Sequence, residues 1–256
     1  MNIVGVNTEN YNITEMQRLL LLTKECIDNK ENYDKFVNYV KNIVTDKNEI
    51  EDDYDTYCFL KNVFRPGNVV LISGPKGSGK TLLATMLAYY LGVDYKKVIA
   101  NYRINIKNFE KLDRTSKIER AKNSLIIIDE SYQLISSRTA MSKRNILINN
   151  ILSKARKHKN LYIIITQIYS AVDKNLRRIA NYVVIPNVVF RDAVLLDKPE
   201  TVVVNVFESI ETLEVIDFLY DFEIDVKDYH LYLYDTHEDV FEIEFDSIKN
   251  QKKKKK

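Results

Sequence analysis

The segment "GPKGSGKT", residues 74–81, has the residue types and the spacing of a phosphate-binding loop. It matches the pattern G-x-x-x-x-G-K-[ST], whose glycines let the backbone curl so that successive N–H groups face phosphate oxygens. In this pattern Lys80 contacts the β- and γ-phosphates, and the Thr81 hydroxyl is a magnesium ligand. The predicted nucleotide-binding residues are Gly74, Pro75, Lys76, Gly77, Ser78, Gly79, Lys80 and Thr81. We therefore expect ATP and Mg²⁺ as cofactors.

A second motif, "LIIIDE", residues 125–130, ends an apolar run with two carboxylates. If the run is a buried parallel strand, Asp129 stands at its carboxyl end, where open α/β sheets bind ligands, and it can hold the magnesium ion. Glu130 can then orient and deprotonate a water for attack on the γ-phosphate. Nucleotide kinases and small GTPases generally lack a glutamate here, and no NKxD guanine motif occurs. The pair favours an ATP-hydrolysing enzyme.

Another apolar run, "LYIIIT", residues 161–166, ends in Gln167 rather than in turn residues. If this strand neighbours the one that ends at Asp129, Gln167 emerges beside the γ-phosphate. Its amide can donate to a phosphate oxygen and accept from the attacking water, so it can sense hydrolysis. Lys80, Glu130 and Gln167 are thus the predicted catalytic residues, with Thr81 and Asp129 as metal ligands. The alternative is a strand-end glutamine that bonds a loop.

The elements that must position these residues alternate between strands and helices. Apolar runs predict strands at residues 69–73, 98–102, 125–129, 161–166 and 182–185. Helical periodicity follows the phosphate loop and ends at Gly92, and a second helix precedes the fourth strand. This alternation predicts an α/β core with a parallel sheet covered by helices on both faces. Together with the phosphate loop and Glu130, it resembles the fold of RecA/ASCE-like P-loop NTPases.

The chain outside that core divides by composition. Residues 1–65 read as a helical accessory region, with the acidic segment 45–55 expected to form a loop. Residues 66–250 read as the ATPase domain, with a core at 66–190 and a β-rich extension at 191–250. In the extension, residues 201–207, 229–236 and 240–245 have the alternation of strands. Residues 251–256 form a lysine tail.

Composition limits the functions open to this chain. Without the five lysines at 252–256, it has 33 basic and 36 acidic side chains, so a nucleic-acid surface must be a local patch. Cys26 and Cys58 have no metal or redox spacing and are expected to be reduced core residues. The sequence shows no membrane-length apolar run and no signal peptide. We expect a cytoplasmic protein without a membrane partner, in the host cytoplasm or the virion if it is viral.

The set of motifs resembles the HerA/FtsK superfamily of DNA-pumping ATPases over residues 66–190. The resemblance rests on "SGPKGSGKT", "LIIIDE", the basic "SKARKHKN", "YIIITQ" and "VDKNLRRIANYVV". Within the superfamily, it is strongest to viral genome-packaging ATPases and to zonula-occludens-toxin-like ATPases of phage assembly. It implies a homo-hexameric ring in which Gln167 is the sensor.

Rings of this kind complete each site with an arginine from a neighbouring subunit, which is worth roughly 10³ to 10⁵ in rate in related chemistry. The sequence leaves the choice open. The candidates are Arg138, Arg156, Arg177 and Arg178. For each of them a solvated surface position is an equal alternative.

The resemblance implies a DNA translocase that packages a viral or plasmid genome and contacts the DNA backbone without reading sequence. Lys143, Arg144, Lys154 and Lys157 are candidates for those contacts, with a solvated helix as the alternative, and a capsid or portal-like protein is a candidate partner. The alternative is an AAA-like loader, or an assembly or secretion ATPase, that acts on protein partners. The polar N-terminal helices favour that alternative. A small-molecule kinase is disfavoured, because the sequence shows no clear substrate lid.

Overall fold

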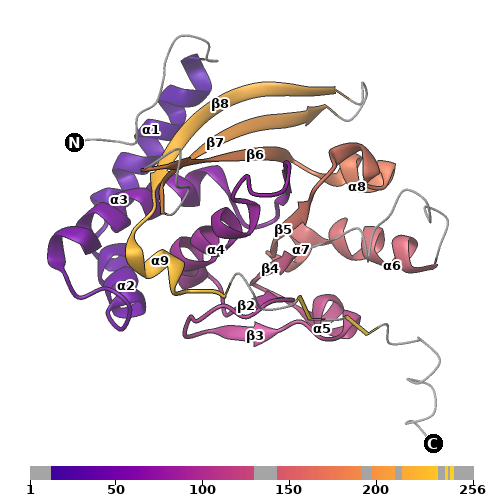
Figure 1. Cartoon of the computed structure of the whole chain (residues 1–256), viewed down its shortest axis with the longest axis horizontal. Helices are drawn as coiled ribbons and strands as arrows, with labels where there is room; N and C mark the ends of the chain where they lie inside the picture. The colour runs from indigo at the N-terminus through magenta and orange to yellow at the C-terminus, as the bar shows by residue number, and fades with distance from the viewer. Residues whose placement is uncertain are drawn as a thin grey trace, which may run out of the picture.

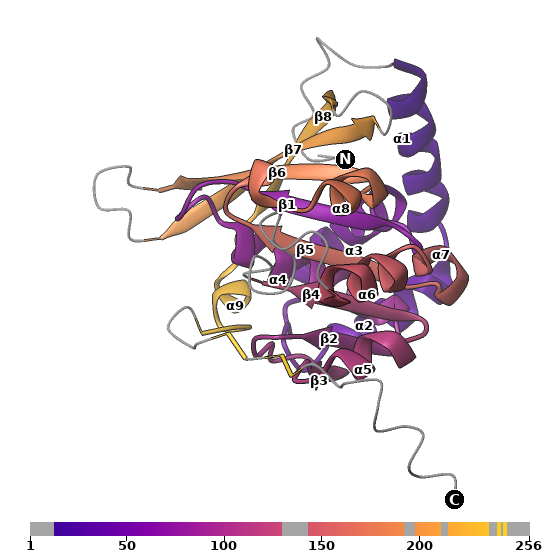
Figure 2. The ribbon, with the colours of Figure 1, turned by 90° about the vertical axis from the view of Figure 1, so that its right-hand side faces the viewer.

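An α/β sheet with eight strands organises the described part of the molecule (Figures 1 and 2). The computed structural model describes residues 13–129, 143–191, 198–210, 215–235, 240–241 and 243–244. The strands are β1 (Val69–Ser73), β2 (Lys97–Ala100), β3 (Phe109–Lys111), β4 (Ser124–Ile128), β5 (Leu161–Thr166), β6 (Tyr182–Phe190), β7 (Pro199–Ile210) and β8 (Val215–Asp225). Their order in the sheet is β3-β2-β4-β5-β1-β6-β7-β8.

The neighbours from β3 through β6 pair in parallel, and β6, β7 and β8 pair antiparallel. All five strands expected from the apolar runs are present. The fifth is longer than expected, since β6 continues to Phe190 to pair with β7. The β-rich extension adds the β7–β8 hairpin to the open edge of the core sheet. The expected α/β fold with a mostly parallel sheet is therefore confirmed.

Helices cover both faces of the sheet. The longer ones are α1 (Ile13–Ile27), α2 (Lys30–Val40), α3 (Lys47–Val63), α4 (Lys80–Leu91) and α6 (Lys143–Leu152). The shorter ones are α5 (Thr115–Arg120), α7 (Ala155–His158), α8 (Lys174–Ile179) and α9 (Asp228–Leu231). Successive residues of a strand point to opposite faces, so Val70 and Ile72 pack with α3 and α4, whereas Val69 and Leu71 pack with α5 to α8.

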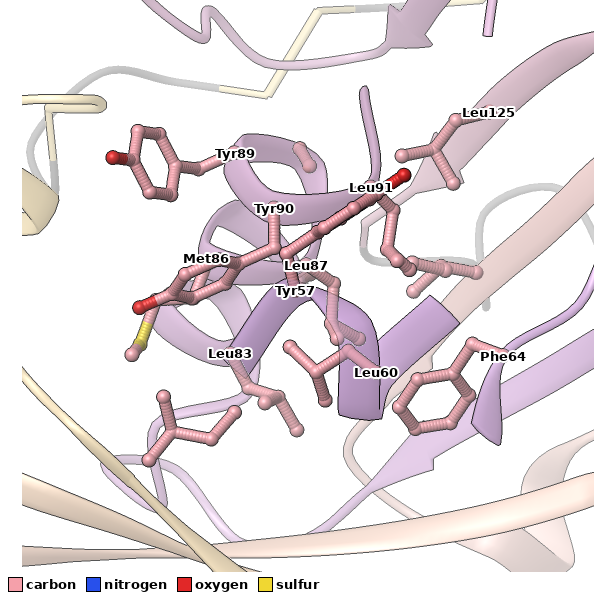
Figure 3. Packing of buried hydrophobic residues seen from close by; sticks show 14 of the residues in the cluster. Tyr57, Leu60, Phe64, Leu83, Met86, Leu87, Tyr89, Tyr90, Leu91 and Leu125 are labelled. Carbon is pink, nitrogen blue, oxygen red and sulfur yellow. The ribbon is translucent and has the colours of Figure 1, made fainter. Parts of the chain in front are cut away.

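The helix after the phosphate loop, α4, is buried on all sides. Figure 3 shows Leu83, Met86 and Leu87 of α4 in one cluster with Leu60 of α3 and with Phe64, the residue after α3. Each of these five side chains is at most 1% exposed. Full burial of such side chains stabilises the fold by about 1.5 to 3 kcal/mol each. The N-terminal helices thus share one hydrophobic cluster with the helix that begins at the phosphate loop.

The acidic segment 45–55, expected to be a loop, is instead the first half of α3. Asp46 caps the helix, because its carboxylate accepts from the backbone N–H groups of Asn48 and Glu49. Such a cap is worth about 1 kcal/mol. The inward face of the segment carries Ile50 and Asp53, both buried. Burial of that face and the cap outweigh the loop-like composition.

Asp53 is the centre of a buried polar cluster that joins α3, α4 and α9. Asp53 is only 1% exposed. The phenol groups of Tyr89, Tyr229 and Tyr90 donate to its carboxylate at 2.6, 2.7 and 3.1 Å. Burial raises the pKa of the Asp53 carboxyl, and these three hydrogen bonds oppose the rise. The cluster fixes the C-terminal α9 against the helix of the phosphate loop.

The segment 229–236, expected to be a strand, begins with the helical turn of α9. Its alternation of aromatic and aliphatic residues imitates a strand. The helical turn carries Tyr229 to Asp53 and buries His230, whose Nδ1 accepts from the Lys227 N–H at 3.1 Å. Burial, with a smaller effect from the Lys227 charge, lowers the pKa of His230 to about 3. Tertiary contacts therefore override the local pattern.

Cys26 and Cys58 form a disulfide, so the expectation of two reduced cysteines is wrong. The residues are 32 positions apart and have no motif spacing. They meet because α1 packs along α3, which brings their Cα atoms to 5.6 Å, within the range for a disulfide. The helices of the described part include none that is both long and apolar enough to cross a membrane.

Replacement of Asp53 by alanine should leave two buried phenols, Tyr89 and Tyr90, and the half-buried phenol of Tyr229 without their acceptor. Each unsatisfied group costs about 1 to 3 kcal/mol, so the free energy of unfolding should fall by roughly 3 kcal/mol or more. Urea denaturation measures it. The control is Asp52→Ala at the exposed neighbouring position, which should change the value by less than about 0.5 kcal/mol. Equal effects of the two substitutions would contradict the role of the cluster.

Candidate nucleotide-binding site

The loop between β1 and α4 has the backbone that its glycines permit. Gly77 and Gly79 have φ angles of 83° and 87°, a left-handed region that side chains disfavour. At Gly79 a second constraint applies, since a Cβ atom would overlap the side chain of Val188 from β6. The fully buried β1 delivers the loop, and α4 begins at Lys80 with its N-terminus facing the loop. This is the arrangement in which backbone N–H groups bind phosphate.

Polar side chains in the loop are placed to meet phosphate oxygens. The Ser78 hydroxyl is buried and has no hydrogen-bond partner among the described residues, so it is available to a phosphate oxygen. The Lys80 ammonium donates to the Pro75 carbonyl at 2.7 Å, a contact that holds it over the loop. Burial lowers the pKa of Lys80, and the negative charge of Asp129 opposes this effect. A nucleotide phosphate would supply the compensating charge.

Thr81 and Asp129 meet although they are 48 positions apart. The Thr81 hydroxyl donates to Asp129 Oδ2 at 2.7 Å, and Asp129 is only 9% exposed. One hydroxyl and one carboxylate oxygen at this separation fit Mg²⁺, which takes few protein ligands and completes its shell with water and phosphate oxygens. The two predicted metal ligands therefore come together at one end of α4.

Asn101 is a part of the site that the sequence motifs do not indicate. It follows β2 directly and is 3% exposed. Its side chain accepts from the Asp129 N–H at 2.7 Å and donates to the Asp129 carbonyl at 2.9 Å. Both backbone groups of Asp129 are thus fixed by one amide. In the sequence, the signal that could have indicated Asn101 is a polar residue directly after an apolar strand.

Gln167 emerges where the sequence motifs place it. The strand before it, β5, lies between β4 and β1, with Ile164 opposite Ile128 and Thr166 opposite Ser73. Gln167 therefore follows β5 at the edge where Gly74 leaves β1, and it is exposed there. The phosphate loop, Asp129 and Gln167 occupy the carboxyl ends of three adjacent parallel strands.

The candidate arginines have different positions. Arg156 and Arg178 are exposed beside the amino end of β1, so the length of that strand, about 16 Å, separates them from their own phosphate loop. Arg177 is half-buried, with its guanidinium 5.5 Å from the ring centre of Tyr169. Glu130 and Arg138 lie outside the described residues.

The basic residues considered for DNA contacts lie in two different places. Lys154 and Lys157 are exposed at α7, on the amino-end side of the sheet. Lys143 and Arg144 begin α6, and their side chains are outside the described part of the chain.

Residues 70–187 match the family model described as "ATPase family associated with various cellular activities (AAA)". The matched segment begins in β1 and ends in β6, so it contains the phosphate loop, Asp129 and Gln167. The fold is that of a P-loop NTPase. Its nucleotide site is of the ATPase type, which binds ATP. No curated protein sequence matches the chain.

Solved structures that match the chain include a domain of a zonular occludens toxin and a viral genome packaging NTPase. The N-terminal domain of zonular occludens toxin from Neisseria meningitidis is 16% identical, with a TM-score of 0.46, covering 66% of this chain and 100% of that one. The genome packaging NTPase of Sulfolobus turreted icosahedral virus 2, in complex with ATP-gammaS, is 12% identical, with a TM-score of 0.40 and coverage of 60% and 97%. The likeness concerns the fold, and the chemistry rests on this chain's own residues.

Substitution of Asn101 by alanine should displace Asp129, because both backbone groups of that residue lose their partner. We expect the kcat for ATP hydrolysis to fall by roughly 10-fold or more, since misplaced catalytic groups have effects of this size. Steady-state phosphate release measures kcat, and circular dichroism confirms folding. Asn105→Ala is the matched control, because exposed Asn105 donates to the Tyr232 carbonyl and has no bond to Asp129. Unchanged kcat in a folded Asn101→Ala protein would contradict the positioning role.

Proposed function

We propose that the chain is an ATP-hydrolysing DNA translocase that moves a viral or plasmid genome and acts as a hexameric ring. The observation that carries the proposal is the position of Gln167 between the phosphate loop and Asp129, at the ends of adjacent strands. This arrangement gives one side chain access to both the γ-phosphate and the attacking water. Together with the order of the motifs from residue 66 to residue 190, it favours a motor over a simple nucleotide-binding module.

The chain's own residues have separate tasks in the hydrolysis. The loop N–H groups, the Ser78 hydroxyl and Lys80 bind and orient the phosphates. Thr81 and Asp129 would hold Mg²⁺, which when bound neutralises charge on the β- and γ-phosphate oxygens. Glu130, directly after Asp129 in the sequence, takes the proton of the attacking water. Gln167 orients that water and reports on the γ-phosphate through its amide.

An arginine acting on the nucleotide belongs to a neighbouring subunit in this proposal. Arg156 and Arg178 lie at the edge of the sheet opposite their own phosphate loop, so neither contacts the nucleotide of its own subunit. A ring that places this edge against the next subunit's loop would bring one of them to that nucleotide. Arg177 and Arg138 are the remaining candidates. A capsid or portal-like protein is the proposed partner that receives the DNA.

The test is ATP hydrolysis by the purified protein with and without DNA, as duplex and as single strand. A translocase should hydrolyse ATP faster when DNA is present, and electron microscopy with an ATP analogue should show rings around DNA. Equal rates with and without both forms of DNA would remove the support for a motor. A protein partner retained in only one nucleotide state would then establish the alternative, a loader or assembly ATPase.

Two substitutions separate binding from hydrolysis. Glu130→Gln should keep ATP bound but lower turnover by roughly 100-fold or more, because it removes the general base. Lys80→Ala should lose ATP binding, because the ammonium is the loop's main positive charge. A fluorescent ATP analogue measures binding, and phosphate release measures turnover. Wild-type turnover in the Glu130→Gln protein would place the general base elsewhere.

A further inference from the structure

A pocket lies at the edge of the sheet opposite the phosphate loop. It has a volume of about 630 Å³ and is lined by the amino ends of β1 and β6. Its walls come from α1, the α3–β1 connection, α7 and α8, elements that surround the start of β1 in Figure 2. The nucleotide site lies at the carboxyl ends of the same strands, so this pocket is separate from it.

The charge of this pocket is strongly one-sided. Four arginines are among the residues that line it, against a single acidic residue, Glu208. They come from four different elements and are all exposed: Arg18, Arg65, Arg156 and Arg178. We call this feature the arginine pocket. Since the chain without its lysine tail has more acidic than basic side chains, such a concentration is local and does not follow from composition.

Lysines extend the positive charge beyond the arginine pocket. Lys154 and Lys157 are exposed beside Arg156, and Lys122 stands just before β4. The pKa of His158 is lowered mainly by burial, and the positive charges of these three lysines lower it further. His158 therefore lies among them. Because β1, β4 and β5 are parallel, the residues that precede them gather along one edge. A row of cations therefore continues from the arginine pocket along the amino ends of the strands.

Guanidinium groups match phosphate in geometry, because their planar forks donate two parallel hydrogen bonds. A single phosphate group or a nucleotide would occupy only part of the surface. Cations spread over several elements suit a polymer whose phosphates repeat at short intervals. We propose that the arginine pocket and the adjoining lysines bind the phosphate backbone of a nucleic-acid strand. This rests on the proposed function, since it assigns to the translocated DNA a binding surface on each subunit.

The binding of fluorescein-labelled DNA, followed by anisotropy over a range of salt concentrations, tests the proposal. The informative variant is Arg18→Gln/Arg65→Gln, which removes two pocket charges and leaves the candidate catalytic arginines intact. Its affinity for DNA should fall by about 10-fold or more. The slope of log affinity against log salt should become shallower by about two, since each lost phosphate contact removes about 0.9 for duplex DNA. ATP hydrolysis without DNA should be unchanged, and stimulation by DNA should be weaker.

The matched control is Lys30→Gln/Lys41→Gln, which removes the same charge from exposed positions at the ends of α2. It should keep the wild-type affinity and salt slope. Thermal melting checks that both double variants are folded.

The outcomes separate this proposal from the proposed function. If the wild type binds DNA and is stimulated by it, but Arg18→Gln/Arg65→Gln behaves like the wild type, the arginine pocket is not the binding surface and the motor proposal stands. An equal loss of DNA affinity in the control variant would also overturn the assignment of the arginine pocket as the binding surface. If the wild type shows neither binding nor stimulation, both proposals fail. Displacement of DNA by polyglutamate at equal charge concentration would identify an acidic protein as the occupant and overturn the nucleic-acid assignment.

Discussion

The parallel pairing of β5 with both β1 and β4 is the constraint on which the rest of the structure depends. Parallel strands present all their carboxyl ends at one edge, so the phosphate loop, Asp129 and Gln167 meet although they are far apart in sequence. Each strand is buried on both faces, and its position along its neighbours is fixed by packing. A site assembled on such strands is more rigid than one carried by loops alone.

Two buried polar networks have specific partners. Asn101 bonds both backbone groups of Asp129, and Asp53 receives three phenol donors. A buried polar group without a partner costs free energy, so each network favours a single arrangement of the elements that it joins. The Asn101 network fixes the position of Asp129 at the carboxyl end of β4. The Asp53 network fixes α4, which follows the phosphate loop, against the N-terminal and C-terminal helices.

The two edges of the sheet differ in chemistry. The carboxyl-end edge holds the nucleotide loop and a buried carboxylate, and the amino-end edge holds a pocket with four arginines. A molecule that binds ATP at one edge and a polyanion at the other has its two anionic ligands separated by the sheet.

The sequence by itself determined the phosphate loop, the apolar strands and the acidic residue at the end of β4. Each of these depends on local features: glycines that permit left-handed backbone, runs long enough for a buried strand, and a carboxylate at a strand end. Only the tertiary structure decided that β5 lies between β1 and β4, that Asn101 holds Asp129, and that Cys26 reaches Cys58. It also extended α3 and turned residues 228–231 into a helix, against their local patterns. These features depend on contacts between distant residues, and hydrophobic periodicity and composition do not specify such pairs.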